Sequence, residues 1–124
     1  MNYRPAICVD FDGTICTWAF PSCGDPTVGV KLALELFRAA GYEIIIWSCR
    51  TAACFRQSPL YNKYIDEMIS FLSEHEIPYD RIDMGNEGKP VADFYIDDRA
   101  ITFTNWMDVV KQFHKMPDYR WDGS

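Results

Sequence analysis

The stretch Ile7-Cys8-Val9-Asp10-Phe11-Asp12-Gly13-Thr14 is the part of the sequence that decides the fold. An apolar run that leads into turn residues predicts a buried strand, here over residues 6–10, that delivers its last side chains to a loop. Carboxylates at the end of a buried strand need a partner, and a hard cation is the usual one. The competing interpretation is that Asp10 caps a helix and that Asp12-Gly13 forms a turn, as Asp-Gly pairs commonly do. A matching set of polar residues further along the chain favours the cation.

The composition is that of a globular protein: 48% of its 124 residues are hydrophobic and 15% are aromatic. A chain of this length predicts one domain over residues 1–124, with a core of its own. The net charge of −6 argues against a protein that coats nucleic acid or a membrane surface. It leaves room for a local cationic pocket that binds an anionic substrate.

The sequence shows no signal peptide and no apolar run of membrane-spanning length, which predicts a cytoplasmic protein with no membrane partner. Five cysteines without a secretory signal then indicate free thiols in a reducing compartment. Cys16, Cys23, Cys49 and Cys54 are spaced too widely for the close pairs of a structural zinc site. Small thiols, buried or half-buried, are therefore the preferred interpretation.

Strand and helix patterns alternate along the rest of the chain, which predicts an α/β fold with a mostly parallel central sheet in a three-layer, Rossmann-like sandwich. The spacing predicts helices over 28–40 and 58–74, a last helix capped by Asn105, strands over 42–47, 79–84 and 94–96, and a short edge strand over 101–104. The second helix is expected to bury Tyr61, Tyr64, Ile65, Met68, Ile69 and Leu72, and the last helix carries Trp106, Val109, Val110 and Phe113 on one side. The tail after Met116 is expected to be a loosely docked end.

Residues 13–27 form a long connection that is rich in glycine, proline and aromatic residues, including Trp18 and Phe20. About 15 residues is long for a connection without structure of its own, which favours a functional flap. The alternative is a surface loop whose aromatic side chains only hold it against the body of the protein. Both interpretations are open at this point.

Polar residues gather after the predicted strands. Asp10 and Asp12 follow the first strand, Ser48 follows the second, Asp97 and Asp98 follow the strand over 94–96, and Lys89 lies in the loop before it. Ligands of an open α/β sheet bind outside the carboxyl ends of the strands. Acids, a hydroxyl and a lysine that meet at one such edge predict a phosphate site with a Mg²⁺ ion.

This set of residues resembles the motifs of the haloacid dehalogenase-like hydrolase superfamily, and specifically its phosphatases. Asp10-Phe11-Asp12-Gly13-Thr14 resembles the first motif, Ser48 the second, Lys89 the third and Asp97-Asp98 the fourth, in that order. The resemblance covers residues 6 to about 113. The intervals after the first motif and after Ser48 have no room for a substantial cap domain, so the chain looks like a small capless member.

The resemblance implies a Mg²⁺-dependent phosphatase that hydrolyses a phosphate monoester through an aspartyl-phosphate intermediate. Asp10 would be the nucleophile, and Asp12 would be the general acid and then the base that activates water. The acids Asp10, Asp12, Asp97 and Asp98 would hold the metal, Asp12 through its backbone carbonyl. Which member of the Asp97-Asp98 pair touches the ion is left open.

The resemblance also implies how the substrate would be held. Ser48 and Lys89 would bind phosphoryl oxygens, and Thr14 would donate a hydrogen bond near the nucleophile. Arg50, next to Ser48, is a candidate substrate contact, because Ser48-Cys49-Arg50 resembles the S-G-R of polynucleotide-end phosphatases in the family.

The size of the substrate, the oligomeric state and the function itself stay open. Without a cap domain, the edge of the sheet can accept a small phosphorylated molecule or the exposed phosphate of a larger one, or a second subunit can cover it in a homo-oligomer. A polynucleotide-end phosphatase is one alternative function, although the acidic charge balance weakens it. A noncatalytic Mg²⁺-binding phospho-switch domain is the other, but in such domains the phospho-accepting Asp comes after a later strand than the paired acids, an order that is absent here.

Overall fold

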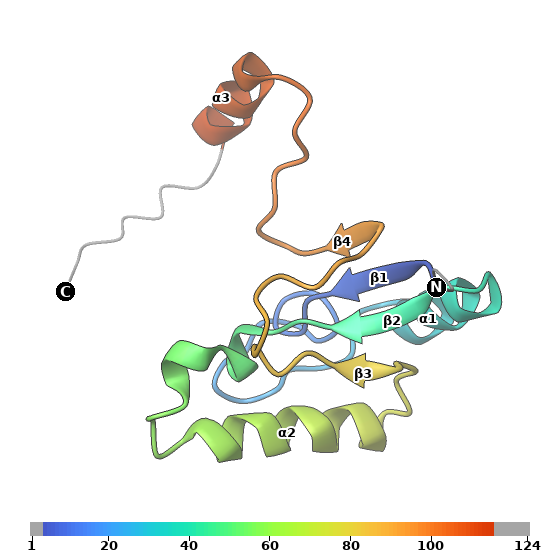
Figure 1. Cartoon of the computed structure of the whole chain (residues 1–124), viewed down its shortest axis with the longest axis vertical. Coiled ribbons are helices and arrows are strands. Elements are labelled where there is room, and N and C mark those ends of the chain that lie inside the picture. Colours follow the sequence, from blue (N-terminus) through green and yellow to red (C-terminus); the bar gives the residue numbers. More distant parts are fainter. Residues whose placement is uncertain (1–3, 116–124) are drawn as a thin grey trace.

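The computed structural model describes residues 4–115, and it confirms the α/β, Rossmann-like fold with a parallel sheet (Figure 1). In chain order the elements are β1 (Ala6–Val9), α1 (Val30–Ala39), β2 (Glu43–Ile46), η1 (Cys49–Thr51), η2 (Ala53–Phe55), α2 (Tyr61–Glu74), β3 (Arg81–Ile82), β4 (Phe94–Ile96) and α3 (Trp106–Lys115). The tail after Met116 lies outside the described residues. Within the described part, no helix is long and apolar enough to cross a membrane.

The sheet has four strands in the order β3-β2-β1-β4, and every pair is parallel. β1 lies in the middle, where Ile7 pairs with Ile44 of β2 on one side and with Phe94 of β4 on the other. β1 and β2 are apolar on both faces, as strands in the middle of a parallel sheet must be. Because the strands are parallel, their carboxyl ends meet at one edge, which is where the predicted polar residues follow them.

One face of the sheet carries the main core, where α1 and α2 pack against it. Ile7 and Ile44 point to this face, and Leu34 of α1 and Met68 of α2 cover them. Gly41 ends α1 as predicted: its φ of +97° lies in the left-handed region, and its amide donates to the Arg38 carbonyl oxygen. The opposite face carries a smaller cluster, whose buried members are Ala6, Cys8 and Ile45.

Two helices differ in detail from the prediction. α1 begins at Val30, because the preceding Gly29 has a left-handed backbone, and α2 begins at Tyr61. The expected burial of Ile69 is wrong, since its side chain is 41% exposed, and Phe71 takes its place in the core. Phe71 packs edge to face against Phe11 of the first motif.

The C-terminal part differs most from the prediction. Residues 101–104 form no strand, because the chain after β4 runs away from the sheet, so the predicted edge strand is wrong (Figure 1). Asn105 caps α3 as expected, and its side-chain oxygen accepts a 3.0 Å hydrogen bond from the Asp108 amide. α3 stands apart from the sheet in Figure 1, so the aromatic residues Trp106 and Phe113 and the β4 residue Phe94 are exposed.

Residues 13–27, between β1 and α1, turn back on themselves and rejoin the sheet edge. The backbone of Cys16 forms isolated β-bridges with Asp12 and with Pro26, and the Thr17 amide donates to the Asp25 carbonyl oxygen at 2.8 Å. Between β2 and α2 lie only the two short 3-10 turns, η1 and η2. Neither interval holds a cap domain, as the sequence predicts.

Candidate functional site

Three carboxylates meet at the carboxyl edge of the sheet. Asp10 follows β1, and Asp97 and Asp98 follow β4, which is paired with β1. One oxygen from each of the three side chains lies within 4.8 Å of the others. The predicted pairing of these acids across neighbouring strands is therefore present in the described residues, with Asp10 half-buried and the other two exposed.

Gly13 brings Asp98 close to the first motif. A Cβ atom at Gly13 would lie 2.3 Å from the Oδ2 atom of Asp98, well inside van der Waals contact. The backbone of Gly13 also has a φ of +84°, which other residues adopt only with strain. The turn therefore favours glycine at this position, and a side chain here would displace the exposed Asp98 carboxylate.

The surroundings of Asp10 favour its protonated form. Burial, the largest cause, raises the pKa of Asp10 to about 7, although its carboxylate accepts a 2.8 Å hydrogen bond from the Phe11 amide. The negative charges of Asp97 and Asp98 contribute to this rise in the pKa. A divalent cation between the three carboxylates would remove this repulsion, and hard oxygen ligands are the donors that Mg²⁺ prefers. The donor set thus fits the predicted ion.

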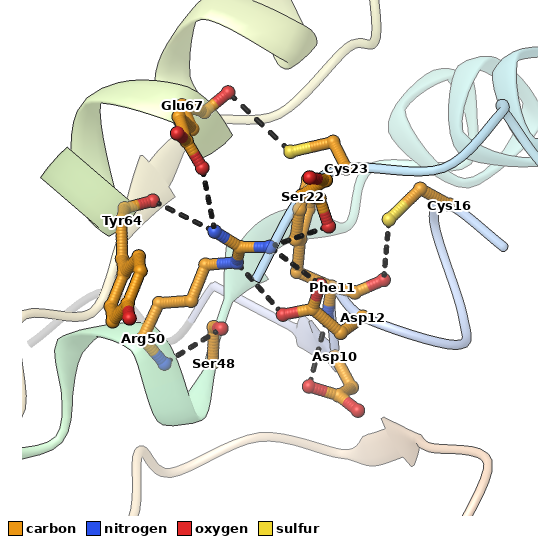
Figure 2. Close-up of polar contacts among 10 residues, drawn as sticks. All are labelled: Asp10, Phe11, Asp12, Cys16, Ser22, Cys23, Ser48, Arg50, Tyr64 and Glu67. Atoms are coloured by element: carbon orange, nitrogen blue, oxygen red, sulfur yellow. Dashed lines mark hydrogen bonds and ion pairs between the residues drawn. The ribbon is translucent and has the colours of Figure 1, made fainter. Parts of the chain in front are cut away.

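Asp12 has different surroundings from Asp10. Its two carboxylate oxygens accept hydrogen bonds from Nε and Nη2 of Arg50, both at 2.8 Å, in a side-by-side geometry (Figure 2). The side chain of Arg50 is fully buried and Asp12 is 8% exposed, so the ion pair is nearly removed from water. Burial lowers the pKa of Arg50, but the hydrogen bonds and charge of Asp12 raise it more, and the guanidinium stays charged.

The remaining donors of Arg50 connect the first motif to residues 13–27 and to α2. Nη2 also donates to the Ser22 carbonyl oxygen at 3.2 Å, and Nη1 donates to the Tyr64 carbonyl oxygen at 3.1 Å (Figure 2). The guanidinium carbon lies 5.1 Å from the centre of the Phe20 ring. Arg50 was predicted to contact substrate, but here its donors are all directed at protein groups.

Ser48 begins the turn that positions Arg50. Its hydroxyl oxygen accepts a 3.1 Å hydrogen bond from the Arg50 amide, and its backbone carbonyl accepts from the Thr51 hydroxyl at 3.0 Å. The single Thr51 hydroxyl proton is shared with the Asp83 carbonyl oxygen, at 2.7 Å, which ties the end of β2 to the end of β3. Ser48 is buried, but it reaches the cavity described below, where its hydroxyl hydrogen can still be donated.

Neither Thr14 nor Lys89 lines the cavity beside the acids. The Thr14 hydroxyl is buried and has no hydrogen-bond partner within the described chain. The Lys89 ammonium lies 4.1 Å from the centre of the Tyr95 ring, on an exposed loop, and does not line the cavity. Its role as a phosphate ligand stays a prediction.

A cavity of about 570 Å³ opens beside the acids. Asp10, Asp12, Ser48 and Asp97 reach it from the sheet edge. Five aromatic residues also line it: Trp18, Phe20, Trp47, Phe55 and Tyr64. The volume is within the range of about 300–1,000 Å³ that small-molecule sites occupy.

Arg99 is a cavity residue that the sequence interpretation did not single out. Its guanidinium carbon lies 4.7 Å from the centre of the Trp18 ring, and its amide donates to the Asp97 carboxylate at 2.8 Å. Its place directly after the paired acids was the signal that could have identified it.

Cys49 also lines the cavity. Burial raises the pKa of its thiol, so Cys49 is a poor nucleophile at neutral pH.

No protein-family model matches the chain, and no curated protein matches it. Among solved structures, a conserved protein from Bacteroides thetaiotaomicron is similar in fold, with a TM-score of 0.62 and 23% sequence identity over 91% of this chain and 92% of that chain. A protein from Vibrio cholerae has a TM-score of 0.46 and 27% identity, over 90% of this chain and 98% of that chain. A chain of the Pnkp1/Rnl/Hen1 RNA repair complex has a TM-score of 0.47 and 18% identity, over 93% of this chain and 33% of that chain. The first likeness supports the α/β fold, and the other two carry no argument about function.

The ion pair between Arg50 and Asp12 predicts a large stability effect. Arg50→Met should lower the free energy of unfolding by about 3–5 kcal/mol, because it leaves a buried carboxylate without its cation. Urea denaturation would measure the loss. Lys63→Met is the matched control: its 4.0 Å contact with Glu67 is exposed, so it should cost less than about 0.5 kcal/mol.

A double variant separates the charge from the packing. Arg50→Met with Asp12→Leu removes both charges, so it should be more stable than Arg50→Met alone. If instead the double variant lost the sum of the two single effects, the two side chains would not be coupled and the ion pair would not hold this part of the fold.

The raised pKa of Asp10 predicts how stability depends on pH when no divalent cation is present. The folded protein keeps the Asp10 proton up to about pH 7, whereas an unfolded chain releases it near about pH 4. The folded state therefore binds more protons in this window, and its stability should fall as the pH rises from about 4 to about 7. Thermal unfolding in a chelator, compared between wild type and Asp10→Asn, tests this. A wild-type profile parallel to that of the variant would contradict the raised pKa.

Proposed function

We propose that this protein is a phosphatase that hydrolyses a phosphate monoester through a covalent phosphate on Asp10, with a divalent cation bound by Asp10, Asp97 and Asp98. The observation that carries the proposal is the meeting of these three carboxylates within 4.8 Å at the mouth of a cavity for a small ligand. Their order along the chain, with Ser48 between them, is the order of the motifs that the sequence resembles.

In the first step an Asp10 oxygen attacks phosphorus, forms the new P–O bond, and releases the ester oxygen of the substrate with its bonding electron pair. When bound, the cation supplies positive charge that lets the anionic nucleophile approach the anionic phosphate. In the second step water attacks the phosphorus of the acyl phosphate, which frees inorganic phosphate and restores the Asp10 carboxylate. Asp10 is half-buried but lines the cavity, so a substrate phosphate can reach it.

Asp12 is the candidate for the proton transfers in both steps. It would give a proton to the leaving oxygen and later take one from the attacking water. In the described arrangement both of its oxygens accept from Arg50, so in this role one oxygen would stay hydrogen-bonded to Arg50 while the other turned to the cavity that Asp12 lines. Arg50 is then a positioning residue, because it acts on the reaction through Asp12.

The phosphoryl oxygens need donors at the same edge. Ser48 and Arg99 both line the cavity, and the Ser48 hydroxyl has a proton to donate. Arg99 contributes a cationic side chain to the cavity wall, while its backbone amide donates to the Asp97 carboxylate, so its guanidinium is a candidate donor to a phosphoryl oxygen. Lys89 would join them only if its loop moved away from Tyr95.

An assay with p-nitrophenyl phosphate and Mg²⁺ at pH 7 tests the proposal. We expect turnover that a chelator abolishes, and Asp10→Asn should lower kcat by at least about a thousandfold, since it removes the nucleophile. Asp66→Asn, a change of the same kind on the exposed side of α2, is the control and should keep full activity.

The outcomes separate the alternatives. Full activity of Asp10→Asn would reject the mechanism. A long-lived phosphoprotein on Asp10 without release of phosphate would instead indicate a phospho-switch domain. Activity with a 3′- or 5′-phosphorylated oligonucleotide but with no small substrate would indicate polynucleotide-end processing.

The contact between Gly13 and Asp98 gives a second test, on cation binding alone. Gly13→Ala should weaken Mg²⁺ binding by about 10- to 100-fold, because the new methyl group displaces the Asp98 carboxylate. Isothermal titration calorimetry would measure the affinity. Gly29→Ala is a matched control, since Gly29 has a φ of +81° and nothing within 4 Å of an added Cβ. Equal Mg²⁺ affinities of the two variants would exclude Asp98 from the cation site.

A further inference from the structure

Three aromatic rings that line the cavity lie next to one another. Trp18 and Phe20 come from residues 13–27, and their ring centres lie 6.2 Å apart. Phe20 in turn lies 5.2 Å from the ring of Tyr64 on α2. The three rings form a continuous row, and all three line the cavity that the carboxylate of Asp10 also reaches.

Packing accounts for part of this row but not for all of it. Phe20 lies between Tyr64 and the buried guanidinium of Arg50, so it holds residues 13–27 against the body of the protein. Trp18 has no such role: its ring contacts are Phe20 and the exposed Arg99, and its side chain is 56% exposed. Exposed aromatic surface inside a concave site next to charged groups is characteristic of ligand binding.

The chemistry of the wall selects the kind of ligand. A flat ring stacks on aromatic side chains with an offset or edge-to-face geometry, and such stacking accepts any ring with a π-face. The guanidinium of Arg99 lies over Trp18, and Arg99 lines the same cavity as Asp10 and Asp97, so it is a candidate phosphate contact. The cavity therefore offers charged groups for a phosphate and aromatic rings for the group that the phosphate is attached to.

We propose that the Trp18–Phe20–Tyr64 wall binds a flat aromatic ring in the leaving group of the substrate, so that the substrate is a small phosphate monoester of an aromatic-ring compound. A nucleoside monophosphate and a simple aryl-methyl phosphate both carry this chemistry. The proposal rests on the proposed phosphatase function for the reaction, but not for the binding.

The charge of the cavity argues for a small ligand over a polymer. The cations that line it are Arg50 and Arg99, and the donors of Arg50 are engaged by Asp12 and by backbone carbonyl groups. A nucleic-acid backbone needs a row of basic residues, and the chain has a net charge of −6. One phosphate and one ring match what the cavity offers.

Matched substrate pairs test the proposal. Adenosine 5′-monophosphate is compared with ribose 5-phosphate, and benzyl phosphate with cyclohexylmethyl phosphate, so that each pair differs mainly in the presence of a flat ring. For the wild type we expect kcat/KM to be higher for the ring-bearing member of at least one pair. The two pairs distinguish a nucleobase from a simple aryl ring.

The variant Trp18→Ala then assigns the preference to the wall. The ratio of kcat/KM values within the preferred pair should fall by about tenfold, because one stacking ring is lost. Trp106→Ala is the matched control: it removes the same ring from α3, where Trp106 is 73% exposed and lies outside the cavity, so the ratio should not change. A ratio that is equal in wild type and Trp18→Ala would overturn the proposal.

A binding measurement keeps this inference separate from the phosphatase proposal. Equilibrium binding of adenosine 5′-monophosphate and of benzyl phosphate, in the presence of Mg²⁺, is measured by calorimetry on the Asp10→Asn, Asp10→Asn/Trp18→Ala and Asp10→Asn/Trp106→Ala variants. A tenfold loss confined to the Trp18 variant supports the aromatic subsite even if wild type hydrolyses nothing. Hydrolysis of all four phosphates without any ring preference would support the phosphatase and overturn the subsite.

Discussion

The buried ion pair between Arg50 and Asp12 is the interaction on which the site depends. Taking two charges out of water is costly, and the cost is offset only when the geometry is good and the remaining donors are satisfied. Here the guanidinium makes two 2.8 Å hydrogen bonds to the carboxylate and further contacts to Ser22 and Tyr64. The end of β1, the turn after β2, residues 13–27 and α2 are thereby held around one side chain.

This arrangement explains how a small chain keeps a defined cavity without a cap domain. Residues 13–27 are anchored at their base by the buried Ile15 and Cys16 and by hydrogen bonds within the segment, whereas Trp18 and Phe20 lie on its exposed part. Arg50 holds this segment in place through the Ser22 carbonyl oxygen and the ring of Phe20. The same residue that orients a candidate catalytic acid also fixes the wall against which a ligand would lie.

The sequence predicts which acids meet at the sheet edge, because the pattern that places each acid lies within a single strand. Apolar runs that end in acids define β1 and β4, and parallel pairing then requires Asp10 and Asp97 to meet. The partner of Arg50 is not predictable in the same way, since it depends on the path of a connection with no regular pattern. The last helix shows a related limit: its period and its Asn105 cap define a helix, but an apolar face does not say which surface it will cover.

Asp10 and Asp12 are two residues apart and carry the same functional group, yet the fold gives them opposite neighbours. Asp12 lies past the end of the strand, in the turn that begins at Phe11, and there it meets a guanidinium that the protein itself supplies. Asp10 lies close to Asp97 and Asp98, and no basic side chain among residues 4–115 forms an ion pair with it, so burial and the two neighbouring negative charges raise its pKa to about 7. Positive charge is thus built in at one carboxylate and absent at the other. A bound divalent ion would complete the set, and the same site would release it when the acids are protonated.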